Sequence, residues 1–120
     1  MRVLAFEDSY DIEALLSAGN VDTSQITLEQ KWNSENAISV IQEFAPNVLL
    51  LDHFMPPMKG LELLKALMLS VKNGELQRPE IIVGISSAGF ANRAMLSAGA
   101  DQAISKFNLA TLDIWQKNGE

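Results

Sequence analysis

The hydrophobic residues of this sequence fall into short runs with two kinds of spacing. Val48–Leu51 and residues 80–85 are nearly continuous aliphatic runs, which are typical of strands buried on both faces of a parallel sheet. Arg2–Phe6 has the same pattern. Apolar and polar residues alternate over residues 26–32, which predicts a half-buried strand at the edge of the sheet. A last short strand is expected over residues 101–105.

Between these strands, apolar residues recur every three or four positions, as in amphipathic helices. Helices are expected from a cap at Asp8 or Ser9 to about Ala18, from a cap at Asn33 or Ser34 to Phe44, from Gly60 to about Lys72, and over residues 90–98. Asn108 is expected to cap a terminal helix that carries Leu109, Leu112 and Trp115. A strand followed by a helix, repeated along the chain, predicts a doubly wound α/β fold: a five-stranded parallel sheet with helices on both faces.

Composition narrows the functional classes. The chain has 120 residues, which suits a single domain over residues 1–120. A formal net charge of -6 argues against direct binding to nucleic acid or to an anionic membrane. The sequence has no cysteine, which excludes disulfides and thiolate metal sites. The apolar N-terminal run is too short for a signal peptide or a membrane span, so a cytoplasmic location is expected.

Polar residues directly follow the predicted strands. Glu7 and Asp8 come after the first strand, Asp52 after Val48–Leu51, Ser86 after the next strand, and Lys106 after the last. Parallel strands in such a sheet all end at one edge, so these side chains are expected to share one cleft. Three crowded carboxylates require a cation, and Mg²⁺ is the natural one for oxygen ligands. A lysine and a hydroxyl beside them suit a phosphoryl group.

These residues lie in motifs that resemble the receiver domains of two-component response regulators, a family that includes the single-domain chemotaxis regulators. The segment DHFMPPMKG over residues 52–60 is similar to the family pattern D-x-x-M-P-x-M-x-G. The acidic pair at residues 7–8, the segment IIVGISS over residues 81–87 and the segment GADQAISK over residues 99–106 follow at the family's spacing. The resemblance covers the whole chain and implies the flavodoxin-like strand order 2-1-3-4-5.

The resemblance also implies a role for each strand-end residue. Asp52 would be the phosphoacceptor, a nucleophile that attacks the phosphorus of a phosphohistidine. Ser86 would be the switch hydroxyl, and Lys106 would contact the phosphoryl group. Mg²⁺ would be held by Asp8 and Asp52 directly, by Glu7 through water and by the backbone carbonyl of Phe54. The domain would catalyse only its own phosphorylation and dephosphorylation.

The implied partners are a histidine kinase or histidine phosphotransferase as donor and a downstream protein as target. Signalling would then proceed through altered protein–protein contacts. The alternative is a pseudo-receiver, which keeps the fold and binds a partner without phosphorylation. Haloacid-dehalogenase phosphatases fit poorly, because they need a second aspartate where this chain has Phe54. A flavin carrier fits poorly as well, because Glu7 and Asp8 would repel a phosphate in the first loop.

The sequence departs from the family pattern near its C-terminal end. The family usually has an aromatic residue where this chain has Ala103, so coupling of the switch hydroxyl to that ring should be absent or rerouted. Proline usually follows the lysine, but here Phe107 does, and a trans peptide bond is expected. Phe54 and Ala88 occupy the two positions that tune hydrolysis of the aspartyl phosphate. The apolar ring of Phe54 cannot orient a water, which predicts a long-lived phosphorylated form.

His53 is the other titratable residue beside Asp52. Strand alternation turns its side chain away from Asp52, which favours a structural role over a second acceptor.

Overall fold

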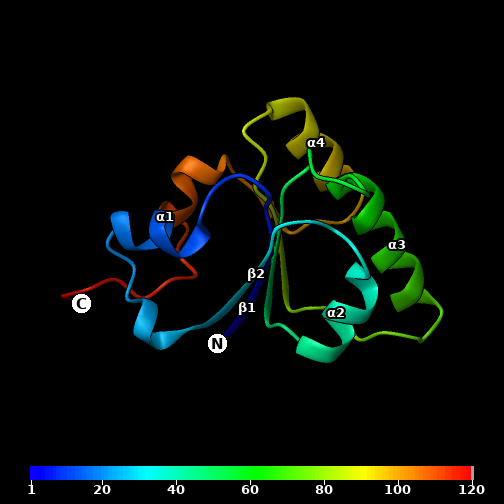
Figure 1. The fold of residues 1–120 in the computed structure, drawn as a ribbon, viewed down its shortest axis with the longest axis horizontal. Coiled ribbons are helices and arrows are strands. Elements are labelled where there is room, and N and C mark those ends of the chain that lie inside the picture. Colours follow the sequence, from blue (N-terminus) through cyan, green and yellow to red (C-terminus); the bar gives the residue numbers. More distant parts are fainter. Residues whose placement is uncertain (120) are drawn as a thin grey trace.

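Five parallel strands form one sheet in the order β2-β1-β3-β4-β5. Figure 1 views this sheet edge-on, with helices on either side of it. The strands are β1 (Arg2–Phe6), β2 (Thr27–Lys31), β3 (Val48–Leu51), β4 (Ile81–Gly84) and β5 (Gln102–Ala103). The computed structural model describes residues 1–119. The predicted parallel sheet and its strand order are confirmed.

The register of the sheet brings the ends of four strands to one level. Phe6 pairs with Leu51, Leu51 with Gly84, and Gly84 with Ala103. The residue that follows each strand therefore emerges beside its neighbours at the same edge. These residues are far apart in the sequence, but the parallel register places them side by side in space.

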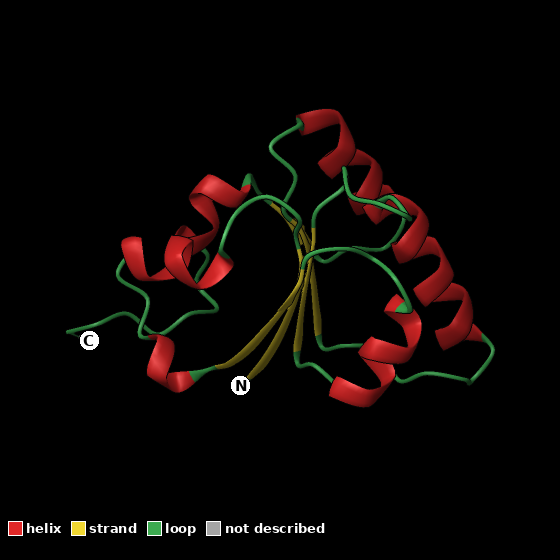
Figure 2. Ribbon diagram, in the orientation of Figure 1, coloured by secondary structure: helices red, strands yellow, loops and turns green. Residues whose placement is uncertain are grey.

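Helices cover both faces of the sheet, as Figure 2 shows with the sheet edge-on. They are α1 (Ile12–Ala18), α2 (Ala37–Phe44), α3 (Gly60–Lys72) and α4 (Gly89–Ser97). One core cluster joins the sheet to α2, α3 and α4, and a second joins the opposite face to α1 and the C-terminal segment. All four residues of β3 are buried between these clusters. Across residues 1–119, no helix is long and apolar enough to cross a membrane.

Two helix starts differ from the prediction. Asp11 caps α1 by accepting a hydrogen bond from the Ala14 N–H, whereas the Ser9 hydroxyl donates to the Asp8 carboxylate. Asn36 precedes α2 in a left-handed conformation and makes no side-chain cap. Ser34 is unavailable as a cap because its hydroxyl bonds to both the N–H and the carbonyl of residue 58 in the loop after β3.

The predicted terminal α-helix is wrong. In its place, the described residues contain a 3₁₀ helix, η2 (Lys106–Thr111), which starts at a Ser105 cap. The Leu109 carbonyl accepts the Leu112 N–H and also the indole N–H of Trp115, which lies 3.0 Å away. This tight turn and the side-chain bond occupy a carbonyl that would otherwise extend an α-helix. Trp115 still packs in the core, as a buried residue beyond η2.

Two further segments differ in extent from the prediction. β5 spans only Gln102–Ala103, so the fifth strand is shorter than expected. The loop expected over residues 20–25 contains a short 3₁₀ helix, η1 (Thr23–Gln25). The shortness of β5 leaves Ala103 as the last residue that pairs with β4.

Candidate functional site

Asp52 lies at the end of the central strand and is 3% exposed. Its N–H donates to the Phe6 carbonyl at 2.9 Å, which continues the β1–β3 ladder by one residue. The chain then turns so closely that a Cβ on Gly60 would lie 1.9 Å from the Asp52 carbonyl oxygen. Glycine at the start of α3 is therefore a steric requirement for the position of Asp52.

Glu7 follows β1 and is fully buried beside Asp52. One carboxylate oxygen of Glu7 accepts the N–H groups of Ser9 and Tyr10 at 2.8 and 3.0 Å. The Asp8 carboxylate is half-buried and accepts the Ser9 hydroxyl at 3.0 Å. The loop after β1 thus fixes the Glu7 carboxylate with backbone donors and leaves Asp8 more open to solvent.

Lys106 supplies a buried cation between two of these acids. Its Nζ lies 2.5 Å from Glu7 Oε1 and 3.4 Å from Asp52 Oδ1. Its backbone N–H donates to the Ile85 carbonyl at 3.0 Å, which holds this first residue of η2 beside the end of β4. The peptide bond between Lys106 and Phe107 is trans, as expected.

The electrostatics of this group raise the pKa values of Asp52 and of Lys106. Burial, followed by the charge of Glu7, raises the pKa of Asp52 to about 6 against the opposing charge of Lys106. Burial acts to lower the pKa of Lys106, but the hydrogen bond to Glu7 and the charges of Asp52 and Glu7 outweigh it, and this pKa is raised overall. The site thus has more negative charge than Lys106 alone balances.

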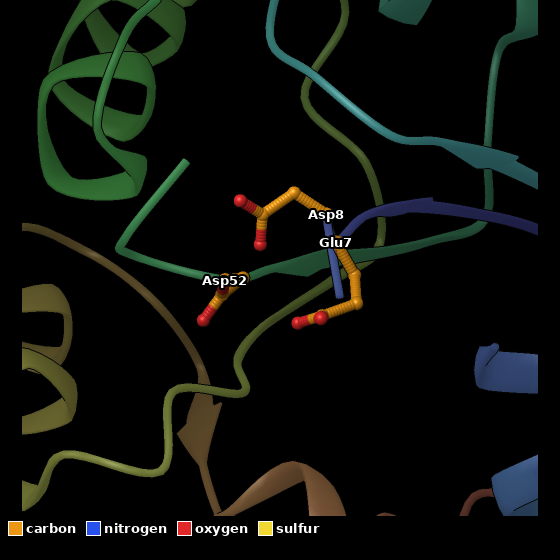
Figure 3. Close-up of side chains that lie close together, drawn as sticks. All are labelled: Glu7, Asp8 and Asp52. Atoms are coloured by element: carbon orange, nitrogen blue, oxygen red, sulfur yellow. The ribbon is translucent and has the colours of Figure 1, made fainter. Parts of the chain in front are cut away.

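The three carboxylates fit a divalent cation. One oxygen each from Glu7, Asp8 and Asp52 lies within 4.8 Å of the others, and Figure 3 shows the side chains converging from β1 and β3. Two ligands on opposite sides of a Mg²⁺ ion are about 4.2 Å apart, since each Mg–O bond is about 2.1 Å. The donor set therefore has the chemistry that Mg²⁺ prefers, and the 4.8 Å within which its oxygens lie is slightly wider than this span. Coordination by the Phe54 carbonyl stays a prediction.

Ser86 lies one strand away from the carboxylates and is 1% exposed. Its Oγ accepts the Ala88 N–H at 3.1 Å, so the hydroxyl is engaged with its own loop. Among residues 1–119, no hydrogen bond joins Ser86 to the carboxylates or to Lys106. The structure thus brings Glu7, Asp8, Asp52 and Lys106 together and places Ser86 beside them with its hydroxyl otherwise occupied.

Asn92, a buried residue of α4, was not predicted from the sequence. Its Oδ1 accepts the Ser86 N–H at 3.0 Å, and its Nδ2 donates to the Ser86 carbonyl at 2.8 Å. Asn92 and Met95 are three positions apart on the buried side of α4. A single polar residue on the apolar face of a helix was the signal that could have revealed it.

Aromatic rings lie on both sides of the site. Phe54 is half-exposed and meets the rings of His53 and Phe90 edge-on at 4.7 and 6.0 Å. Tyr10 and Phe107 pair edge-on at 5.0 Å. His53 is buried, and its Nδ1 accepts the Leu61 N–H at 3.3 Å, which agrees with a structural role at the start of α3.

The doubly wound fold with acids at the ends of β1 and β3 defines a receiver-type α/β domain. The sequence matches the model of the response regulator receiver domain over residues 3–113, and the chain belongs to this family. A comparison with the curated proteins gives no significant match. Receiver domains are signalling domains of two-component systems, and they interact with histidine kinases or phosphotransfer proteins and with downstream targets.

Solved structures of receiver domains share this fold. The response regulator domain of CheB from Thermotoga maritima is 23% identical, with 88% of this chain and 77% of that chain covered and a TM-score of 0.63. The BeF3-activated N-terminal receiver domain of RstA from Klebsiella pneumoniae is 23% identical, with coverages of 88% and 86% and a TM-score of 0.68. The receiver domain of the histidine kinase CKI1 from Arabidopsis thaliana is 18% identical, with coverages of 92% and 85% and a TM-score of 0.70.

Proposed function

We propose that this chain accepts a phosphoryl group on Asp52 in a Mg²⁺-dependent reaction and signals through altered protein–protein contacts. The observation that carries the proposal is the group of three carboxylates, two of them buried and that of Asp8 half-buried, whose oxygens lie within 4.8 Å, with Lys106 bridging Glu7 and Asp52. Acids packed this closely are unfavourable without a cation, so the arrangement suits a metal and a phosphoryl group better than it suits the fold alone.

The covalent step is a displacement at phosphorus. A carboxylate oxygen of Asp52 attacks the phosphorus of a phosphohistidine on a histidine kinase or phosphotransferase. The new P–O bond forms as the P–N bond breaks, and the leaving imidazole takes a proton from solvent. The product is an acyl phosphate on Asp52. The attacking oxygen must be ionised, and the pKa of about 6 leaves Asp52 mostly ionised at neutral pH.

The remaining residues of the site would position Mg²⁺ and the phosphoryl group and would neutralise their charges. Asp8 and Asp52 would hold Mg²⁺ directly, Glu7 through water, and Phe54 through its backbone carbonyl. When bound, the metal would neutralise the charge that builds up on the phosphoryl oxygens. Lys106 would pair with one of those oxygens, and Ser86 would donate its hydroxyl to another. We place the protein in the cytoplasm.

Incubation with acetyl phosphate tests the proposal. We expect the intact mass to rise by one phosphoryl group with Mg²⁺ and to stay unchanged when Mg²⁺ is chelated. Asp52→Asn should gain nothing under either condition, whereas Asp113→Asn, an exposed matched change, should behave as the wild type. A wild type that gains no phosphoryl group with Mg²⁺ present would favour the pseudo-receiver alternative.

A further inference from the structure

We infer that Asn92 is a positioning residue that couples Ser86 to α4, so that α4 responds to the phosphoryl group on Asp52. This inference rests on the proposed function and adds a route for its signal. The departure at Ala103 leaves the sequence without the aromatic ring through which the family is expected to pass this signal. The structure contains another connection, which runs from β4 to the adjacent helix.

The connection consists of two buried hydrogen bonds to one peptide unit on each side of Ser86. The Asn92 amide accepts the Ser86 N–H at 3.0 Å and donates to the Ser86 carbonyl at 2.8 Å. The orientation of the amide is fixed by these partners, since an N–H requires an acceptor and a carbonyl requires a donor. Asn92 is 9% exposed and Ser86 is 1% exposed, so water cannot easily replace either bond.

Close packing at β4 supports the amide. A Cβ on Gly84 would lie 3.2 Å from Asn92 Oδ1 and 3.0 Å from the sulfur of Met95. Gly84 thus provides the space in which the Asn92 side chain approaches the strand. A displacement of the Ser86 backbone must therefore move Asn92 and α4 with it or break both bonds.

Two features allow α4 to respond. The Ser86 hydroxyl accepts the Ala88 N–H, and a hydroxyl that turns to a phosphoryl oxygen on Asp52 releases this N–H and loosens the start of α4. On its other side, α4 borders α3 along an open groove of about 370 Å³, lined by Leu61, Lys65, Ala94, Ser97 and Ala98. The Asn92 amide is then the remaining side-chain tie between Ser86 and α4.

Hydrogen–deuterium exchange of α4 tests this route, with beryllofluoride and Mg²⁺ as a stable stand-in for the phosphoryl group. In the wild type we expect exchange in residues 89–97 to change by roughly fivefold or more on loading, the low end of ordinary coupling between sites. Asn92→Leu removes both bonds and should lose this difference while still gaining a phosphoryl group from acetyl phosphate. Asn92→Asp keeps an acceptor for the Ser86 N–H but places an oxygen against the Ser86 carbonyl, so one of the two bonds is lost. The loading-dependent difference in α4 exchange should therefore be reduced.

Ile41→Val is the matched control, since it weakens the core in α2 without touching Ser86. Ile41→Val should keep the loading-dependent difference in α4. If Asn92 had only a structural role, its substitution would likewise raise exchange equally in loaded and unloaded protein and leave the difference unchanged. A full difference in Asn92→Leu and Asn92→Asp overturns the inference, as does a wild type that loads but responds at residues 102–111 instead of α4. A wild type that never loads overturns the proposed function, and the inference with it.

Discussion

Lys106 Nζ lies 2.5 Å from Glu7 Oε1, and both side chains are almost fully withdrawn from solvent. The lysine is therefore committed to Glu7 in the unphosphorylated protein and lies farther from Asp52. A phosphoryl group on Asp52 would add negative charge on that side and compete with Glu7 for the same cation.

Removal of this cation should weaken the fold at neutral pH. Lys106→Met leaves the buried carboxylates of Glu7 and Asp52 without their counter-ion, a change that costs about 3–5 kcal/mol when a buried pair is broken. The loss should shrink as the pH falls and Asp52, whose pKa is raised, takes up a proton. Urea unfolding at neutral and mildly acidic pH measures it. Lys65→Met, an exposed change on α3, should have little effect at either pH.

Asp52 should destabilise the metal-free protein above pH 6. Its pKa is raised to about 6 in the folded state by burial and by Glu7, whereas the unfolded carboxyl titrates near its ordinary value of about 4. The folded state therefore binds the proton more tightly, and this stabilisation is present below about pH 4 and lost as the pH rises through 6. Asp52→Asn should be more stable than the wild type by at most about 3 kcal/mol at pH 7, with little difference at pH 4.

Denaturant unfolding in the presence of a chelator measures this difference. Asp113→Asn, at an exposed carboxyl, provides the control. An Asp52→Asn variant that is no more stable than the wild type at pH 7 would contradict the raised pKa.

Phe54 should slow the loss of the phosphoryl group. Its ring is half-exposed against Phe90 and offers no group that could orient an attacking water. Phe54→Asn supplies such a group and should speed dephosphorylation by roughly tenfold or more, a modest share of what acid–base assistance can give. Intact mass followed after removal of the donor gives the rate, and Phe54→Leu should decay as slowly as the wild type. Decay of the wild type within seconds would contradict this account.

Gly60 should be intolerant of a side chain. Gly60→Ala places a Cβ against the Asp52 carbonyl, and that backbone must shift at a cost of about 1–3 kcal/mol. Gly89→Ala is the matched change at the first residue of α4, where the nearest atom belongs to the flexible end of Arg93 at 3.2 Å. Thermal unfolding should show a clear loss for the first variant alone. Equal melting temperatures would mean that the loop after Asp52 yields easily.

The sequence predicted those parts of the site that depend on the sheet. Val48–Leu51 is a continuous aliphatic run, so the central strand and the place of Asp52 followed from local pattern. Lys106 could be placed because parallel strands end at a common edge, whatever the details of β5. These features depend on burial and on strand register, which the hydrophobic pattern of the sequence predicts.

The features that the sequence did not reveal depend on side chains that bond to backbone. Ser34 bonds to the loop after β3 and not to its own helix, so the start of α2 was misplaced. Trp115 reaches back to the Leu109 carbonyl, and the expected terminal helix is a 3₁₀ turn. Asn92 clamps Ser86 across a loop. The hydrophobic periodicity of the sequence does not indicate which residues such bonds will join.

The most direct test of the account is to locate the phosphoryl group. Hydride reduction converts an aspartyl phosphate to homoserine, so protein treated with acetyl phosphate and Mg²⁺, reduced and digested can be read by peptide sequencing in a mass spectrometer. We expect homoserine at Asp52, its absence when Mg²⁺ is chelated, and an unaltered Asp8. Homoserine at Asp8, or an unmodified Asp52 in protein that has gained a phosphoryl group, would contradict it.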